Sequence, residues 1–237
     1  MSIAAVIPSR YQSSRFPGKP LARIAGMTMI ERVYRQAAAA GCFAQIVVAT
    51  DDQRIFDEVI CFGGSAEMTD KHIKSGTERV WAVMERRDLA AAVNIQGDEP
   101  MIAAELVRDV AQALAKKPIV SAARRSRSYD DFCSRNIVKV VCDRNDQALY
   151  FSRAPIPYAE KSGFDGFWQH IGIYGYTREM LRSFIASGPV ELERRENLEQ
   201  LRFLFLGLPI HMIQTDFVAH GVDVPGDIER IEKILRS

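Results

Sequence analysis

Short apolar runs alternate with helix-forming segments through the first half of this sequence, and this alternation constrains the fold more than any other feature. Residues 4–7, 46–49, 91–95 and 119–122 are apolar over the length of a buried strand. Segments with helical spacing and capping residues lie between these runs. Because a strand that is repeatedly followed by a helix returns to a parallel neighbour, the pattern predicts an α/β domain with a mostly parallel sheet and crossover helices.

Similar local signals predict the other elements. Thr28 and Glu31 have the spacing of a capping box, which predicts the start of a helix that stops near Gly41. The predicted helices cover about residues 28–40, 52–62, 75–84, 104–115, 178–185, 196–206 and 225–235, and the later strands 137–142, 148–152, 170–176 and 210–214. The sequence contains no internal repeat or low-complexity segment.

Length and charge limit the class of protein. The 237 residues fit one α/β domain, with or without a small lobe. A net charge of +1 gives no overall attraction to nucleic acid or to an anionic membrane. The four cysteines lack C-x-x-C spacing, which favours reduced thiols. No apolar segment is long enough to span a membrane. Since the first residues also lack the pattern of a secretory signal, we expect a cytoplasmic protein.

The loop after the first strand carries Arg10, Arg15 and Lys19. Ligands of open α/β sheets bind at the carboxyl ends of strands, and these cations suit the oxygens of a nucleoside triphosphate. The loop is not a Walker A motif, because Ser13 and Pro20 stand where that motif requires Gly and Ser or Thr. The alternative is a solvated surface loop.

Three further segments lie where strands meet helices. Gln96–Pro100 offers one or two carboxylates, of which Asp98 is placed to bind Mg²⁺, and Gly221–Asp227 offers Asp223. Each aspartate has an alternative role as a helix cap. Ser75–Arg79 could present backbone N–H groups and a guanidinium to an anion, or could be an ordinary capped helix.

These segments are parts of an ordered series. It includes Arg-Phe-Pro-Gly-Lys-Pro-Leu at 15–21, Ser-Gly-Thr-Glu-Arg at 75–79 and Asn-Ile-Gln-Gly-Asp-Glu-Pro at 94–100. The other members lie at 7–10, 48–51, 150–154, 170–176, 198–202 and 222–223. The series resembles the 3-deoxy-D-manno-octulosonate (Kdo) cytidylyltransferases, also called CMP-Kdo synthetases, over nearly the whole chain.

The resemblance implies a Rossmann-like nucleotidyltransferase fold with a mostly parallel central sheet flanked by helices. It implies one cytidylyltransferase domain in which about 1–125 bind nucleotide, about 126–215 form a smaller sugar-binding and dimerisation lobe, and about 216–237 return with a metal-binding turn and a C-terminal helix. The implied reaction joins CTP and Kdo into CMP-Kdo and pyrophosphate for lipopolysaccharide synthesis. It implies Mg²⁺ as cofactor and a homodimer, with neither nucleic acid nor membrane as partner.

The same resemblance assigns roles to residues. Arg10, Lys19, Asp98 and Asp223 form the implied catalytic group, and the two aspartates carry Mg²⁺. The implied nucleotide contacts are Arg10, Ser13, Arg15, Lys19, Asp51, Ser75 and Arg79. The implied sugar contacts are Gln96, Arg153, His170, Tyr174, Glu199 and Gln200.

Other functions stay open at this stage. The acceptor could be an 8-amino-3,8-dideoxy-octulosonate or a sialic acid-like sugar. Glu99 in Gln-Gly-Asp-Glu-Pro favours Kdo over the amino sugar. A non-catalytic nucleotide-binding protein would not need Lys19, Asp98 and Asp223 together. For His170 we expect a neutral or positive hydrogen-bond donor to the hydroxyls or carboxylate of the sugar rather than a metal ligand, since Mg²⁺ prefers oxygen ligands.

Overall fold

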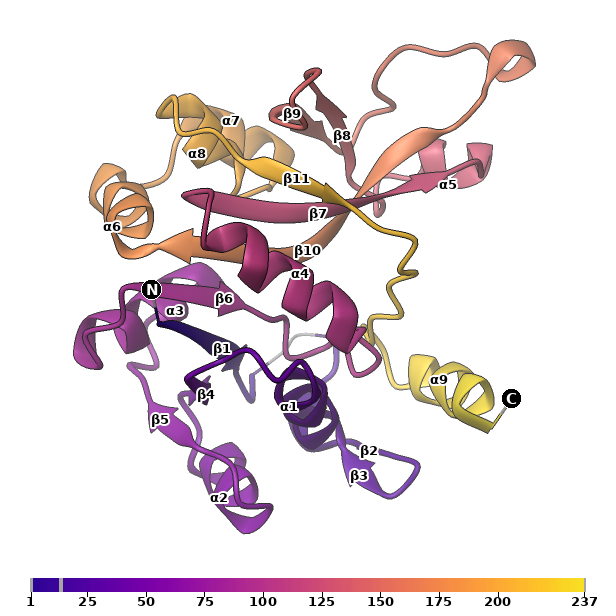
Figure 1. Cartoon of the computed structure of the whole chain (residues 1–237). Coiled ribbons are helices and arrows are strands. Elements are labelled where there is room, and N and C mark those ends of the chain that lie inside the picture. The colour runs from indigo at the N-terminus through magenta and orange to yellow at the C-terminus, as the bar shows by residue number, and fades with distance from the viewer. Residues whose placement is uncertain (1, 13–14, 237) are drawn as a thin grey trace.

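The computed structural model, which describes residues 2–12 and 15–236, contains one large sheet and a separate small hairpin (Figure 1). The strands of the large sheet are β1 (Ile3–Ser9), β4 (Gln45–Thr50), β5 (Ala66–Met68), β6 (Ala91–Asn94), β7 (Ile119–Ser126), β8 (Lys139–Cys142), β9 (Ala148–Ser152), β10 (Phe167–Thr177) and β11 (His211–Gln214). The hairpin pairs β2 (Arg23–Ile24) with β3 (Met27–Thr28).

Helices cover both faces of the large sheet. The α-helices are α1 (Met29–Ala39), α2 (Gln53–Cys61), α3 (Gly76–Arg86), α4 (Ala104–Leu114), α5 (Tyr129–Cys133), α6 (Arg178–Ser187), α7 (Glu191–Glu196), α8 (Leu201–Phe205) and α9 (Gly226–Arg236). The described residues also form the short 3-10 helices η1 (Lys19–Leu21) and η2 (Lys161–Gly163). The α/β class is therefore confirmed.

The sheet is mostly parallel, as predicted. Along the path β11–β7–β10–β6–β1–β4–β5, every neighbouring pair is parallel except the two pairs that include β10. β10 is eleven residues long, and it also pairs with β8, which in turn pairs with β9. This single antiparallel strand therefore connects the parallel sheet to the β8–β9 hairpin at the top of Figure 1.

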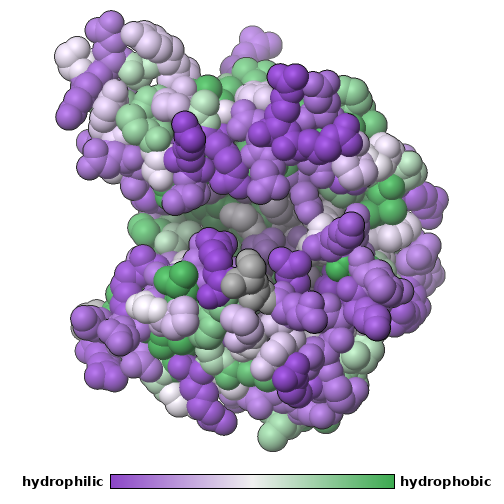
Figure 2. Space-filling model, turned by 180° about the vertical axis from the view of Figure 1, so that it is seen from behind, coloured by the Kyte–Doolittle hydropathy of each residue, from purple (hydrophilic) through white to green (hydrophobic). Residues whose placement is uncertain are grey.

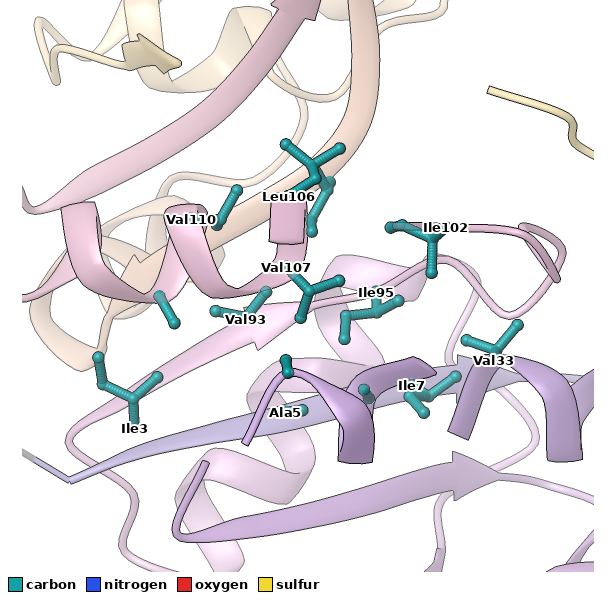
Figure 3. Packing of buried hydrophobic residues seen from close by; sticks show 14 of the residues in the cluster. Ile3, Ala5, Ile7, Val33, Val93, Ile95, Ile102, Leu106, Val107 and Val110 are labelled. Atoms are coloured by element: carbon teal, nitrogen blue, oxygen red, sulfur yellow. The ribbon is translucent and has the colours of Figure 1, made fainter. Parts of the chain in front are cut away.

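The continuous apolar run of β1 is explained by burial on both of its faces. Ile3, Ala5 and Ile7 pack in one hydrophobic cluster with α1 and α4, as Figure 3 shows. Ala4 and Val6 point to the opposite cluster, which includes α3 and α6. A strand between two helical layers must be apolar at every position, whereas a half-exposed strand would alternate.

Two local predictions are wrong. Thr28 does precede α1, but its side chain makes no capping bond, and Glu31 accepts hydrogen bonds from Arg35 instead. The predicted helix over 196–206 is shorter than expected, because α7 ends at Glu196 and α8 covers only Leu201–Phe205. Asn197 takes a left-handed conformation (φ 52°) at the end of α7, and this residue breaks the helix. The break matters because residues 197–200 then form a connection that lines the site.

Within the described part of the chain, no helix combines the length and the apolar character that crossing a bilayer requires.

Candidate active site

A cleft opens at the carboxyl ends of β1 and β6, and it is visible as a hollow across the face drawn in Figure 2. It holds two cavities, of about 360 and 370 Å³. The first is lined by the loop after β1, the start of α3, the turn after β6 and Asp223. The second is lined mainly by β10 and by the connection between α7 and α8. Gln96 and Glu199 line both, so the two cavities adjoin.

A glycine shapes the cationic loop after β1. Gly18 has φ +73°, which favours glycine, and its N–H donates to the Tyr11 carbonyl at 2.9 Å. A β-carbon at this position would lie 3.1 Å from the Tyr11 ring. The turn directs Lys19 into the first cavity, where Arg10 and Arg15 also lie. The predicted contact Ser13 lies outside the described residues.

Each predicted metal-binding aspartate is paired with a cation of this loop. Lys19 Nζ donates to Asp98 Oδ2 at 2.7 Å and to the Val222 carbonyl at 2.8 Å. Arg15 donates to both carboxylate oxygens of Asp223, at 3.0 and 3.2 Å. Tertiary structure therefore brings together three segments that are about 80 to 210 residues apart in sequence, since the Lys19–Asp98 and Arg15–Asp223 pairs span 79 and 208 positions.

The donor atoms at this place fit Mg²⁺. Asp98 and Asp223 offer carboxylate oxygens only, and Mg²⁺ is typically held by one or two protein carboxylates together with phosphate oxygens and water. The Val222 N–H donates to the Asp98 carbonyl at 3.0 Å, so the two aspartate-bearing segments are in direct contact. No cluster of three or more His, Cys, Asp or Glu side chains suited to a metal occurs among residues 2–12 and 15–236, so a full protein cage is not formed there.

Glu99 adds a further carboxyl group beside these aspartates. Burial, together with the nearby charges of Asp98 and Asp223, raises its pKa to about 7. Its Oε2 atom is buried and has no hydrogen-bond partner among the described residues, while the backbone N–H of His220 donates to the carboxylate. Glu99 is not among the predicted site residues, although its place next to Asp98 in the sequence is a signal for it.

Arg79 lines the first cavity but is held by protein groups. It is only 2% exposed, and it donates to Asp51 Oδ2 at 2.8 Å, to the Thr69 hydroxyl and to the Ile73 carbonyl at 3.3 Å. Asp51 is thus the counter-ion of Arg79, and it is not one of the residues that line the cavity. Ser75 caps α3 by accepting from the Glu78 N–H at 3.1 Å. These contacts fix the wall at the start of α3.

The second cavity gathers the predicted sugar contacts. All six line it: Gln96, Arg153, His170, Tyr174, Glu199 and Gln200. They come from the turn after β6, from the end of β9, from β10 and from the α7–α8 connection. No local pattern in the sequence specified that these four segments would meet.

His170 lies within β10 rather than at its start, and its imidazole is neutral, because burial lowers its pKa to about 3. Its Nε2 lies 3.0 Å from the Ser121 hydroxyl, which donates to the Ile173 carbonyl at 2.9 Å. Since that hydroxyl has one proton, it accepts from His170, and we assign the Nε2–H tautomer. Nδ1 is then a hydrogen-bond acceptor, whereas the sequence predicts a donor to the sugar.

Glu199 sits where the two cavities adjoin. Burial raises its pKa, and hydrogen bonds with the side chains of Thr77 and Ser75 oppose that rise. Ser75 therefore serves two groups, the N-terminus of α3 and this carboxylate. Behind them, the rings of Tyr174 and Tyr176 stack at 5.7 Å, which confirms that the two tyrosines share one face of β10.

Comparisons with known proteins agree with this geometry. The model of a family described as cytidylyltransferase matches residues 4–210. A 3-deoxy-manno-octulosonate cytidylyltransferase of Syntrophotalea carbinolica is 45% identical over 249 aligned positions that cover all of both chains. One of Geobacter sulfurreducens is 41% identical, again over the full length of both.

Solved structures give the same result. A CMP:2-keto-3-deoxy-manno-octonic acid synthetase complexed with CTP superposes with a TM-score of 0.95 at 36% identity, covering 100% of this chain and 99% of the other. A 4-diphosphocytidyl-2C-methyl-D-erythritol synthase from Anaerococcus prevotii has a TM-score of 0.68 at 12% identity, which indicates a shared fold alone.

Proposed function

The chain belongs to the cytidylyltransferase family, and from this premise we propose that it activates Kdo with CTP. The anomeric hydroxyl of Kdo loses its proton to solvent and its oxygen bonds to the α-phosphorus of CTP, while the bond to the pyrophosphate oxygen breaks. The products are CMP-Kdo and pyrophosphate. The observation that carries this proposal is the pair of adjoining cavities, one cationic and one polar, with Gln96 and Glu199 at their junction.

The triphosphate fits the first cavity by charge. Arg10, Arg15 and Lys19 supply guanidinium and ammonium donors on one loop. The side chains of the Arg15–Asp223 pair are 65% and 58% exposed, and such solvated pairs contribute little to stability. Arg15 can therefore exchange Asp223 for phosphate oxygens at small cost, which frees the carboxylate for a cation.

The proposed Mg²⁺ ligands are Asp98 and Asp223. A bound Mg²⁺ would neutralise charge on the reacting phosphate and lower the pKa of the attacking hydroxyl. Lys19 then keeps the position between Asp98 and the Val222 carbonyl, so it holds both ligand-bearing segments while it faces the triphosphate.

The sugar fits the second cavity. The neutral His170 presents Nδ1 as an acceptor for a sugar hydroxyl, while Arg153 supplies positive charge for the sugar carboxylate. Gln96 and Glu199 contact the part of the sugar next to the nucleotide, because they line both cavities. Much of the rate enhancement then comes from holding the hydroxyl and the α-phosphate together and from offsetting the negative charge.

Release of pyrophosphate from CTP tests this function. We expect release only when both Kdo and Mg²⁺ are present, and Asp98→Asn or Asp223→Asn should reduce kcat by orders of magnitude. Asp109→Asn, at an exposed position of α4, is the matched control and should be neutral. Near-normal turnover in both site variants would overturn the metal assignment.

The assay also identifies the sugar. Kdo, an 8-amino-3,8-dideoxy-octulosonate and a nine-carbon sialic acid-like sugar should be compared side by side, with kcat/KM highest for Kdo. Calorimetric binding of CTP without turnover of any of the three would instead indicate a non-catalytic nucleotide-binding protein.

We also propose a cytoplasmic homodimer that uses the surface near β9 and α8. These elements are in contact, and Leu149 on β9 and Phe205 on α8 are each 61% exposed. Large exposed apolar side chains on adjoining elements support an interface. Light scattering should give twice the chain mass, and Leu149→Asp together with Phe205→Asp should give monomers.

A further inference from the structure

Lys139, at the start of β8, is a buried cation to which the proposed reaction gives no role. It is fully buried, and its ammonium donates to three backbone carbonyls: Ser134 at 2.8 Å, Ile137 at 2.7 Å and Arg153 at 2.6 Å. An ammonium has three donors, so all of its hydrogen-bonding capacity is used by the backbone. Removing it would leave buried carbonyls without partners.

The three carbonyls belong to two segments that meet at the second cavity. Ser134 and Ile137 bracket the turn between α5 and β8, whereas Arg153 directly follows β9. The Arg153 guanidinium donates to the Arg135 carbonyl of that same turn at 3.0 Å. Lys139 thus fixes both the backbone of Arg153 and the turn that holds its guanidinium.

A carboxylate completes this arrangement. Glu196 accepts from the Arg153 N–H at 2.9 Å and from the Ser152 hydroxyl at 2.7 Å, and its own carbonyl accepts from Arg153 Nε at 2.8 Å. Arg153 also donates to the Asn197 carbonyl at 3.2 Å, at the start of the connection that carries Glu199 and Gln200. The cavity wall therefore depends on the placement of Arg153.

We propose that Lys139 is a positioning residue for the sugar site: its three hydrogen bonds hold Arg153 so that the guanidinium faces the carboxylate of the acidic sugar. The proposal rests on the proposed function for the identity of the sugar. Lys139 itself does not line the second cavity, so it acts through Arg153. Among residues 2–12 and 15–236, no hydrogen bond of this network reaches the cationic loop of the first cavity, so CTP binding should be independent of Lys139.

The test compares Lys139→Met, Arg153→Ala and the double variant. Lys139→Met should raise the KM for Kdo at least tenfold and leave the KM for CTP within twofold. In the Arg153→Ala background, Lys139→Met should change the KM for Kdo less than twofold, because residues that act as a unit are non-additive. Equal effects in both backgrounds, or a parallel rise in the KM for CTP, would overturn the proposal.

Val140→Ala is the matched control, since Val140 is the buried neighbour on β8 and makes no side-chain contribution to this network. It should lower Tm without the selective rise in the KM for Kdo, and the same selective rise would refute a specific role for Lys139. If Lys139→Met does not fold, Lys139→Gln keeps two donors and carries the same comparison with a smaller rise.

Failure of this proposal can be told apart from failure of the proposed function. Wild-type turnover of Kdo tests the function. The role of Lys139 is tested by the ratio of the variant's affinity for the sugar to that of the wild type, whichever acidic sugar is used. Calorimetric titration with Kdo alone gives that ratio without turnover. Unchanged affinity in Lys139→Met would refute the positioning role.

Discussion

Replacing Glu99 by Gln tests the electrostatics of the site most directly. Burial and the charges of Asp98 and Asp223 raise the pKa of Glu99 from 4.5 to about 7. The folded protein therefore holds this proton more tightly than the unfolded chain does. The resulting stabilisation is complete below pH 4.5 and is lost as the pH rises to about 7. Gln resembles the protonated carboxyl group in shape and cannot ionise.

The size of the effect follows from the rise in pKa. One pH unit corresponds to about 1.36 kcal/mol, so a rise from 4.5 to about 7 corresponds to about 3 kcal/mol. The unfolding free energy of Glu99→Gln minus that of the wild type should be constant below pH 4.5 and should grow by up to that amount by pH 8. For a chain of this length, the difference in Tm should grow by about 6–12 °C.

Thermal unfolding should be followed by circular dichroism from pH 4 to 8 in the presence of a chelator. The chelator is needed because a cation bound by Asp98 and Asp223 would lower the pKa of Glu99. Glu85→Gln, at an exposed position of α3, is the matched control and should parallel the wild type at every pH. A difference between Glu99→Gln and wild type that stays constant across this range would refute the account of the buried carboxyl group.

Three other substitutions test packing, ion pairing and capping. Gly97→Ala would place a methyl group 2.8 Å from the Ser9 hydroxyl, so we expect the free energy of unfolding to fall by about 1–3 kcal/mol and kcat to decrease. Unchanged Tm and kcat would contradict this close approach. Arg202→Met should lower the free energy of unfolding, measured by calorimetry, by about 3–5 kcal/mol, because the buried Glu193 loses its partner at 2.6 Å. Adding Glu193→Leu should recover much of that loss, and additive losses would argue against a paired charge. Asp52→Ala should lower the free energy of unfolding by about 1 kcal/mol at neutral pH, because α2 loses its N-terminal cap. The pKa of Asp52 is lowered by its hydrogen bond with Arg54, so this loss should disappear only as the pH falls through that lowered pKa, and a loss that persists in stronger acid would contradict the capping role.

Local patterns in the sequence were sufficient for most of the fold. The apolar run of β1 and the helical spacing that follows predicted buried parallel strands, because a strand covered on both faces must be apolar throughout. The same patterns failed at residues 196–206, where the left-handed conformation of Asn197 ends α7. They also failed at Thr28, whose position before α1 was predicted but whose side chain makes no cap. Both differences depend on the backbone or side-chain conformation of a single residue, which the hydrophobic periodicity of a segment does not predict.

The sequence by itself determined which chemical groups stand at the ends of strands, because strand and helix signals are local and their order fixes where each loop lies. Only the tertiary structure decided how those groups are used. It paired Lys19 with Asp98 and Arg79 with Asp51, and it brought the Arg153 carbonyl within hydrogen-bond distance of the buried Lys139 ammonium. The physical reason is that burial, counter-charges and hydrogen-bond partners come from segments distant in the chain. These surroundings, rather than residue type alone, set pKa values and side-chain positions.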